Sequence, residues 1–150
     1  MDMTGYLTMD GTDVWTAYRA FLCEREDEHK NMDALLRLPK AKDVTTVDFR
    51  ERHGVDLPQD PDLRLSSIER TLQFAIIAAS DAQRLSCYQN FLAALLTGVK
   101  VFTVKDYRTY HLLYRDMPSD PSWYNDYGQG KFVVIFSIKF LEANPALNND

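Results

Sequence analysis

The feature that most constrains the fold is one long helical pattern with strand-like patterns on both sides of it. Ser80 and Gln83 form a capping box at its start, and Gly98 is placed to end it in the left-handed conformation. At about 100° per residue, one broad face collects Ala82, Leu85, Tyr88, Phe91, Leu92, Leu95 and Leu96. The sequence therefore predicts a helix over residues 80–97 that packs on a sheet, or partly on a neighbouring subunit.

Short strand patterns precede this helix. Asp10-Gly11 separates Tyr6–Met9 from Thr12–Trp15, and this dipeptide favours a hairpin because both turn positions need positive φ. Further strands are expected at Ala20–Cys23, Val44–Arg52 and Ile68–Ile77, with a short helix at Met32–Leu38 that ends before Pro39.

Three strand patterns follow the helix, over Lys100–Val104, Thr109–Arg115 and Lys131–Leu141, with a long loop at Met117–Gly130. Helices and strands do not alternate as in βαβ units, so the sheet should be mainly antiparallel. We expect an α+β fold: a mainly antiparallel split β-barrel or sandwich of about seven strands with one flanking helix. Residues 1–150 are expected to form a single domain, with a frayed tail at residues 142–150.

Composition narrows the class of protein. A chain of 150 residues with 45% hydrophobic residues is typical of one globular domain. The net charge of −5 argues against a dedicated nucleic-acid binder. No apolar run approaches the ~20 residues of a membrane span, and the N-terminus does not resemble a signal peptide. We therefore expect no membrane partner and a cytoplasmic location, with Cys23 and Cys87 as free thiols.

The sequence offers no clear catalytic or metal-binding pattern. His29, His53 and His111 lack a partner at ligand spacing, and Asp10 reads better as a turn residue than as a cation ligand. Asp56, Asp60 and Asp62 lack the glycine and glutamate of an EF-hand loop, and Cys87 reads as a packed thiol. We expect no catalytic, metal-binding or cofactor-binding residue, and hence a protein that is not an enzyme.

Two aromatic segments are candidates for binding. Tyr107, Tyr110 and Tyr114 interleave with basic residues, but strand parity places them on the face opposite His111 and Arg115, which argues against specific nucleic-acid binding. The loop carrying Trp123, Tyr124 and Tyr127 has two interpretations: a contact surface for another protein, or rings buried over the mouth of the barrel.

The sequence resembles phage tail proteins of the distal-tail type. The resemblance covers most of the chain except residues 24–40. It is carried by the opening YLTMDGTDVWTAYRAFL (residues 6–22), the central block from Ile68 to Asp106, and the closing segments YRTYHLLYRDM and GKFVVIFSIKFLEANP. The middle block has a strand, then a helix that ends at a glycine before the next strand, as in that family.

This resemblance implies a non-enzymatic structural subunit that forms an oligomeric ring where the tail tube meets the baseplate. It also implies a split barrel with one flanking helix, a homo-oligomer with a hexamer favoured, and other tail proteins as partners. The location would then be the cytoplasm or the assembled virion tail. The alternative is a small partner- or ligand-binding module without catalytic activity.

A ring needs two different contact patches on each subunit. One candidate is the loop with Trp123, Tyr124 and Tyr127. The other is the edge of the N-terminal hairpin, which carries Tyr6 and Trp15.

Overall fold

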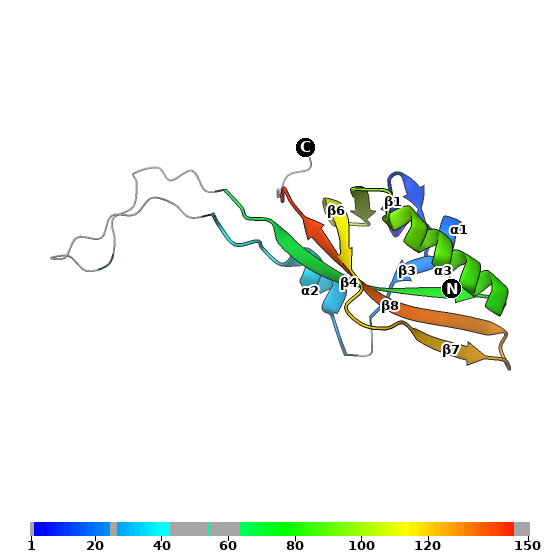
Figure 1. The fold of residues 1–150 in the computed structure, drawn as a ribbon. Coiled ribbons are helices and arrows are strands. Elements are labelled where there is room, and N and C mark those ends of the chain that lie inside the picture. The colour runs from blue at the N-terminus through cyan, green and yellow to red at the C-terminus, as the bar shows by residue number, and fades with distance from the viewer. Residues whose placement is uncertain (1, 25–26, 43–53, 55–63, 146–150) are drawn as a thin grey trace.

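The computed structural model describes residues 2–24, 27–42, 54 and 64–145 (Figure 1). In chain order the elements are β1 (Leu7–Met9), β2 (Thr12–Asp13), α1 (Val14–Tyr18), β3 (Ala20–Leu22), α2 (Lys30–Leu36), β4 (Ile68–Ala78), α3 (Asp81–Leu95), β5 (Lys100–Val104), β6 (Thr109–Asp116), β7 (Ser122–Asp126) and β8 (Lys131–Glu142). The strand expected at Val44–Arg52 and the aspartates between Asp56 and Asp62 lie outside the described residues.

The strands form one curled antiparallel sheet in the order β2-β1-β5-β6-β8-β4-β3, and β7 pairs with β8 beside that path. Its spine is the pairing of β4 with β8 over 11 residue pairs, from Ile68↔Glu142 to Ala78↔Phe132. β6 pairs with β5 through its first half and with β8 through its second half, so it turns the sheet from one half to the other. The predicted α+β class and the antiparallel split barrel are confirmed.

The N-terminal hairpin forms, but the strand prediction beyond it is wrong. Asp10 and Gly11 have φ of 54° and 84°, as the turn requires. Val14 and Trp15 instead begin α1, which joins β2 to β3 at the two ends of the strand order. The helix crosses the open side of the curled sheet, where burial of Val14 and Trp15 outweighs their local preference for strand.

Helix α3 has the predicted N-cap, but it ends at Leu95, before the predicted Thr97, and it buries a different face. Ser80 Oγ accepts a hydrogen bond from the Gln83 amide (3.1 Å), and Gln83 reaches back to the Ala79 amide (3.0 Å). Gly98 has a φ of 130°. Leu85 and Leu96, however, are 46% and 66% exposed. The apolar arc is wider than the surface that the sheet offers, so its margin stays in solvent.

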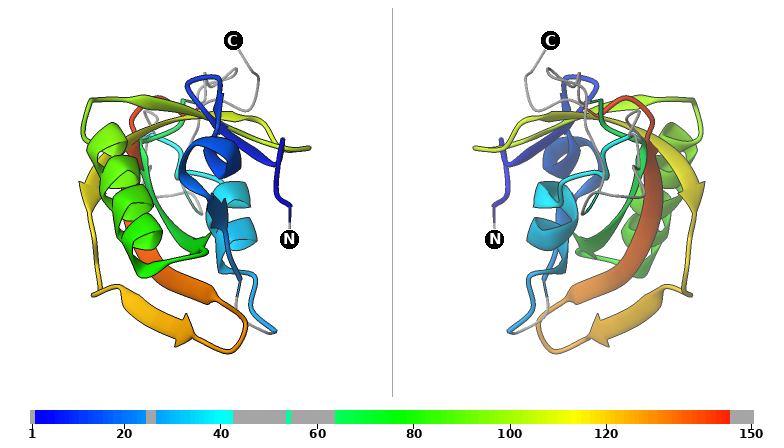
Figure 2. Two further views of the ribbon diagram at one scale, coloured as in Figure 1. Left: turned by 90° about the vertical axis from the view of Figure 1, so that its right-hand side faces the viewer. Right: turned by 90° about the vertical axis from the view of Figure 1, so that its left-hand side faces the viewer.

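The core lies between α3 and the inner face of the sheet. Phe91 packs on Phe74 and Phe136, with ring centroids 5.3 and 5.9 Å apart, and Phe74 also packs on Phe140. The inward residues of β8 alternate along the strand as predicted. Figure 2 shows α3 packed along one side of the curved sheet and the short helices α1 and α2 along the other.

The C-terminal third differs from the sequence prediction in one element. The segment predicted as a loop between Met117 and Gly130 contains β7, which pairs with β8 from Ser122↔Ile135 to Asp126↔Lys131. A strand was not predicted because its aromatic and polar residues do not alternate as they would on a half-buried strand. β8 continues through Glu142, which is buried although it begins the segment expected to be frayed.

Two leucines of α3 test the assignment of its buried face. Leu95 is 1% exposed, so Leu95→Ala should lower the free energy of unfolding by about 2–5 kcal/mol through the cavity that it leaves. Leu85→Ala, the same change at an exposed position, should alter it by less than about 0.5 kcal/mol. Urea unfolding measures both, and equal losses would show that the face is misassigned.

Candidate functional site

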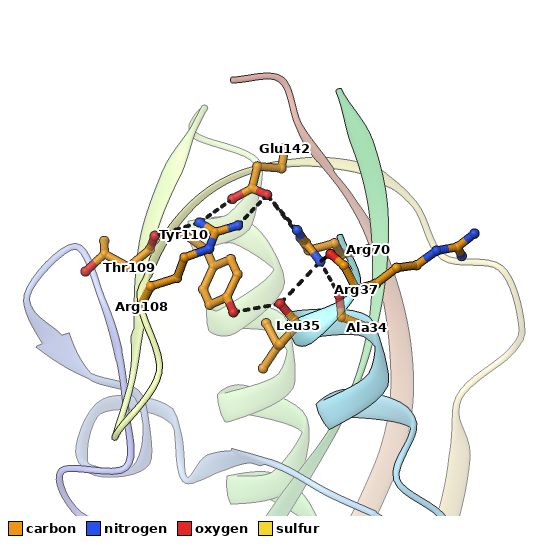
Figure 3. Close-up of polar contacts among 8 residues, drawn as sticks. All are labelled: Ala34, Leu35, Arg37, Arg70, Arg108, Thr109, Tyr110 and Glu142. Carbon is orange, nitrogen blue, oxygen red and sulfur yellow. Dashed lines mark hydrogen bonds and ion pairs between the residues drawn. The ribbon is translucent and has the colours of Figure 1, made fainter. Parts of the chain in front are cut away.

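A buried ion cluster lies at one end of the β4–β8 spine (Figure 3). Glu142, the last residue of β8, accepts hydrogen bonds from Arg70 Nη2 of β4 at 2.9 Å and from Arg108 Nη2, just before β6, also at 2.9 Å. Arg108 Nη1 reaches the second carboxylate oxygen at 3.0 Å, which makes the contact bidentate. Glu142 and Arg70 are 2% and 1% exposed, so this carboxylate and one guanidinium group are held away from water, while Arg108 is half-buried.

The same cluster holds the C-terminal end of α2. Arg70 Nη1 donates to the carbonyl oxygens of Ala34, Leu35 (3.3 Å) and Arg37 (3.0 Å), and the Tyr110 hydroxyl donates to Leu35 O at 2.7 Å. The last carbonyls of a helix lack partners within the helix and carry partial negative charge, which a guanidinium neutralises. Arg70 therefore acts as a cap that fixes α2 against the sheet.

A hollow of about 480 Å³ opens beside this cluster, between the end of α2 and the turn before β6. Its lining includes Leu36, Arg37, Leu38 and Tyr107. Leu36 and Leu38 are 62% and 63% exposed, and the Arg37 side chain points away from the ion cluster in Figure 3. The lining of the hollow thus contains exposed leucines and Arg37, whose guanidinium takes no part in the ion cluster.

A second buried arginine joins α3 to the hairpin of β7 and β8. Arg84 Nη1 donates to Tyr124 O (3.1 Å), Asn125 Oδ1 (2.6 Å) and Val133 O (3.2 Å), and Nη2 pairs with Asp81. Its guanidinium also lies 5.1 Å from the centroid of the Trp123 ring. Because Arg84 binds backbone oxygens of both strands, it fixes the hairpin relative to the helix.

The predicted aromatic segment is exposed. Trp123, Tyr124 and Tyr127 are 44%, 51% and 78% exposed, although Trp123 packs one edge on Tyr88 of α3. The interpretation in which these rings are buried over the barrel is therefore wrong. Their role as a subunit contact stays a prediction.

The other two predicted interface residues are placed differently. Trp15 lies in α1, is 9% exposed, and packs on Phe21 with ring centroids 5.9 Å apart. Tyr6 is half-buried. β1 is paired on both sides, by β2 and β5, so the edge of the hairpin is the two-residue strand β2. The contact role of Tyr6 and Trp15 also remains a prediction.

The described residues were searched for clusters of catalytic or metal-binding side chains by type and position. Within this part of the chain, no group of three or more His, Cys, Asp or Glu residues is arranged to hold a metal ion. Asp10 accepts a hydrogen bond from the Val101 amide (2.8 Å), which holds the pKa of that carboxyl below its usual range and agrees with a turn role. Cys87 is half-buried on α3, and burial raises the pKa of its thiol.

No helix in the described ranges is long and apolar enough to cross a membrane.

The sequence analysis did not identify the charged residues that fix α2 and the β7–β8 hairpin, which are Arg70, Arg84, Arg108 and Glu142. For two of them the burial pattern of the strands contains a signal. Arg70 shares its strand face with Leu72 and Phe74, and Glu142 shares its face with Ile138 and Phe140. A charge at an inward position of a strand indicates a buried pair, because an unpaired buried charge is strongly unfavourable.

Comparison with known proteins gives matches among solved structures. No protein-family model and no curated protein matches the sequence. Among solved structures, the chain superposes on the Dit protein (gp 19.1) of phage SPP1, described as a paradigm of the hub adsorption apparatus in phages that infect Gram-positive bacteria. The TM-score is 0.48 and the sequence identity 14%, over 90% of this chain and 49% of that chain. The chain spans about half the length of that protein.

Glu142→Gln tests the ion cluster. Removing the charge leaves the buried Arg70 without its countercharge, so the free energy of unfolding should fall by about 3–5 kcal/mol. Glu69→Gln makes the same change at an exposed position of β4 and should alter it by less than about 0.5 kcal/mol. Chemical unfolding at neutral pH gives both values. Similar small losses would mean that the cluster is not formed in solution.

Tyr110→Phe tests the hydrogen bond to the end of α2. Its loss should cost about 1 kcal/mol at neutral pH. Burial raises the pKa of Tyr110 above its ordinary value of 10.0. The stabilisation is therefore complete below about pH 10 and is lost as the pH rises through the pKa of the folded state. The difference between wild type and Tyr110→Phe should stay constant below about pH 10 and shrink above it, and a difference that stays constant at higher pH would contradict this.

Proposed function

We propose that this protein is a non-enzymatic structural subunit of a phage or prophage tail, which assembles with copies of itself into a ring at the junction of tail tube and baseplate. The observation that carries the proposal is the apolar surface left outside the core. Nine large hydrophobic side chains of the described residues are exposed, and they lie on or near α2, α3 and β7. They are Met32, Leu36 and Leu38 near α2; Leu85, Leu96 and Val99 on or after α3; and Trp123, Tyr124 and Tyr127 at β7.

Exposed aromatic side chains such as Trp123, Tyr124 and Tyr127 are of the type enriched at protein contacts. Exposed apolar residues on several elements suit a subunit with more than one neighbour, because each contact of a ring joins two different patches. Subunit contact is therefore the function that this surface supports best.

The sequence resemblance supplies the class of assembly. The opening hairpin, the strand that leads into a capped helix ending at a glycine, and the closing strands all resemble distal-tail-type proteins. The architecture expected from that resemblance is the one that the chain adopts. A net charge of −5 also suits a ring through which DNA passes, since basic linings retain phosphate. The protein would occupy the host cytoplasm first and the virion tail after assembly.

The alternative is a small partner- or ligand-binding module, and the hollow beside Tyr107 favours it. A concave apolar site with a few polar groups is the usual form of a small-molecule site. The two functions differ in one measurable property, because a binding module has no need to associate with itself.

Sedimentation equilibrium and native mass spectrometry over a range of concentrations test the proposal. We expect a concentration-dependent oligomer, with a hexamer as the end state and closed rings in negative-stain images. Tyr124→Ala should weaken association by about 2 kcal/mol, the range of an interface hot spot, while Tyr124→Phe keeps the ring and should retain most of it. A monomer at every concentration would rule out self-assembly and favour the binding module.

A further inference from the structure

The outer edge of β7 is unpaired within the described part of the chain. β7 pairs with β8 alone, and no backbone hydrogen bond joins it to a third described segment. Figure 1 shows β7 at the margin of the ribbon, beside β8. The strand contains neither lysine nor proline, and its ladder with β8 is regular, so it lacks the usual devices that block a sheet edge. Such an edge can receive another strand.

The hydrogen bonds of the β4–β8 spine settle which way the backbone of β8 points. In a strand, the N–H and C=O of one residue point to one side and those of the next residue to the other side. Ile77 of β4 donates to Arg19 O (3.4 Å), on the side of β3, so its neighbour Ile76 points toward β8. Ile76 is paired with Val134. The adjacent residue of β8, Val133, therefore points away from β4 and toward β7.

Trp123 and Asn125 consequently present their N–H and C=O groups to the outside. Val133 is paired with Tyr124, so these two residues exchange their backbone hydrogen bonds. Arg84 Nη1 reaches the carbonyl oxygens of both, at 3.1 and 3.2 Å, as it can only where the two carbonyls lie close together across the ladder. The residues on either side of Tyr124 point the other way, toward the open edge.

This edge is complementary to itself. When two copies of β7 run antiparallel about a twofold axis at Tyr124, Trp123 of each copy faces Asn125 of the other, and both pairs exchange backbone hydrogen bonds. The charge of the strand fits the same register, because Asp126 then faces Ser122. Parallel pairing in register would instead place the two Asp126 carboxylates side by side, which is unfavourable.

The side chains also fit this arrangement. Asn125 and Trp123 turn toward α3, where Arg84 contacts the Asn125 Oδ1 (2.6 Å) and lies over the Trp123 ring. Because side chains alternate along a strand, Tyr124 lies on the opposite face, and it is exposed. A twofold axis perpendicular to the sheet keeps each face on its own side. The two Tyr124 rings therefore meet on the face away from α3, at a position without backbone hydrogen bonds, where side chains are closest.

We propose that β7 of one copy of this chain pairs antiparallel with β7 of a second copy, which joins their sheets across a twofold axis at Tyr124. A second copy is favoured over another extended segment because the outward backbone groups, the aromatic ring and the charge of β7 all match β7 itself in one register. Arg84 acts as a positioning residue, since it holds β7 from the other face. The contact joins a patch to itself, whereas the contacts that close a ring join different patches, so the inference goes beyond the proposed function.

Tyr124→Cys tests the register by cross-linking. Directly opposed residues at this kind of position have Cα atoms about 4.5 Å apart, a distance that a disulfide spans. Under mild oxidation of the full chain, Tyr124→Cys should form a covalent dimer on a non-reducing gel. Wild type treated in the same way measures any cross-linking through Cys23 and Cys87.

The matched control is Tyr127→Cys. Tyr127 is more exposed than Tyr124, so random collisions would favour cross-linking at Tyr127. In the proposed register the two copies of Tyr127 are offset by about six residues, or about 20 Å along the strands. Tyr124→Cys should therefore give at least about fivefold more covalent dimer than Tyr127→Cys.

Charges at the same position test the twofold symmetry. Tyr124→Lys and Tyr124→Glu each place like charges opposite one another, so each should weaken self-association at least about tenfold. An equimolar mixture of the two variants should recover most of the association, since lysine then faces glutamate. If Tyr124 contacts a different residue of the neighbour, the mixture gains nothing. Sedimentation gives the dissociation constants, and circular dichroism verifies that each variant is folded.

The outcomes separate this inference from the proposed function. Preferential cross-linking of Tyr124→Cys with recovery in the mixture supports the pairing, even if dimers are the largest species and the proposed ring fails. Rings that form while Tyr124→Cys cross-links no better than Tyr127→Cys would overturn the pairing and leave the ring. Loss in both charge variants without recovery in the mixture also overturns the pairing. A wild-type monomer at every concentration would remove both, and would leave the edge of β7 to an extended segment of a different protein.

Discussion

The two halves of the sheet are fixed to each other through one buried carboxylate. Glu142 ends β8 and binds Arg70 of β4 and Arg108 at the start of β6, and Arg70 in turn caps α2. The aromatic core supplies most of the burial, and the pairing of β4 with β8 over 11 residue pairs sets the register of the sheet. Charge-assisted hydrogen bonds between fixed donors and acceptors have narrow geometry, so they select one arrangement among those that the core would accept. The position of α2, and the hollow beside it, follow from this selection.

At the opposite end of the molecule, a second buried arginine also holds backbone oxygens in place. Arg84 is buried between α3 and the β7–β8 hairpin and donates to backbone oxygens of both strands. β7 has little core of its own, since its residues are mostly exposed and it pairs only with β8 among the described strands. A strand in this position needs an anchor, and Arg84 provides it together with the contact of Trp123 on Tyr88. One arginine thus holds α2 and another holds the β7–β8 hairpin.

The proposed assembly follows from what the core leaves outside. Leucines near α2 and aromatic residues of β7 remain exposed although the same chain buries phenylalanines completely. Association would remove this apolar area from water.

The sequence by itself determined the elements with strong local signals: the Asp10-Gly11 turn, the capped helix α3, and the alternation of β4 and β8. These depend on backbone conformation and on periodicity, which neighbouring residues settle among themselves. Only the tertiary structure decided that Val14 and Trp15 enter a helix, that residues 122–126 form a strand, and that Leu85 lies in solvent. Each of these depends on the space and partners offered by segments distant in the chain. The ion cluster was also decided by the tertiary structure, because Arg70 and Glu142 are 72 positions apart and no local sequence pattern predicts their contact.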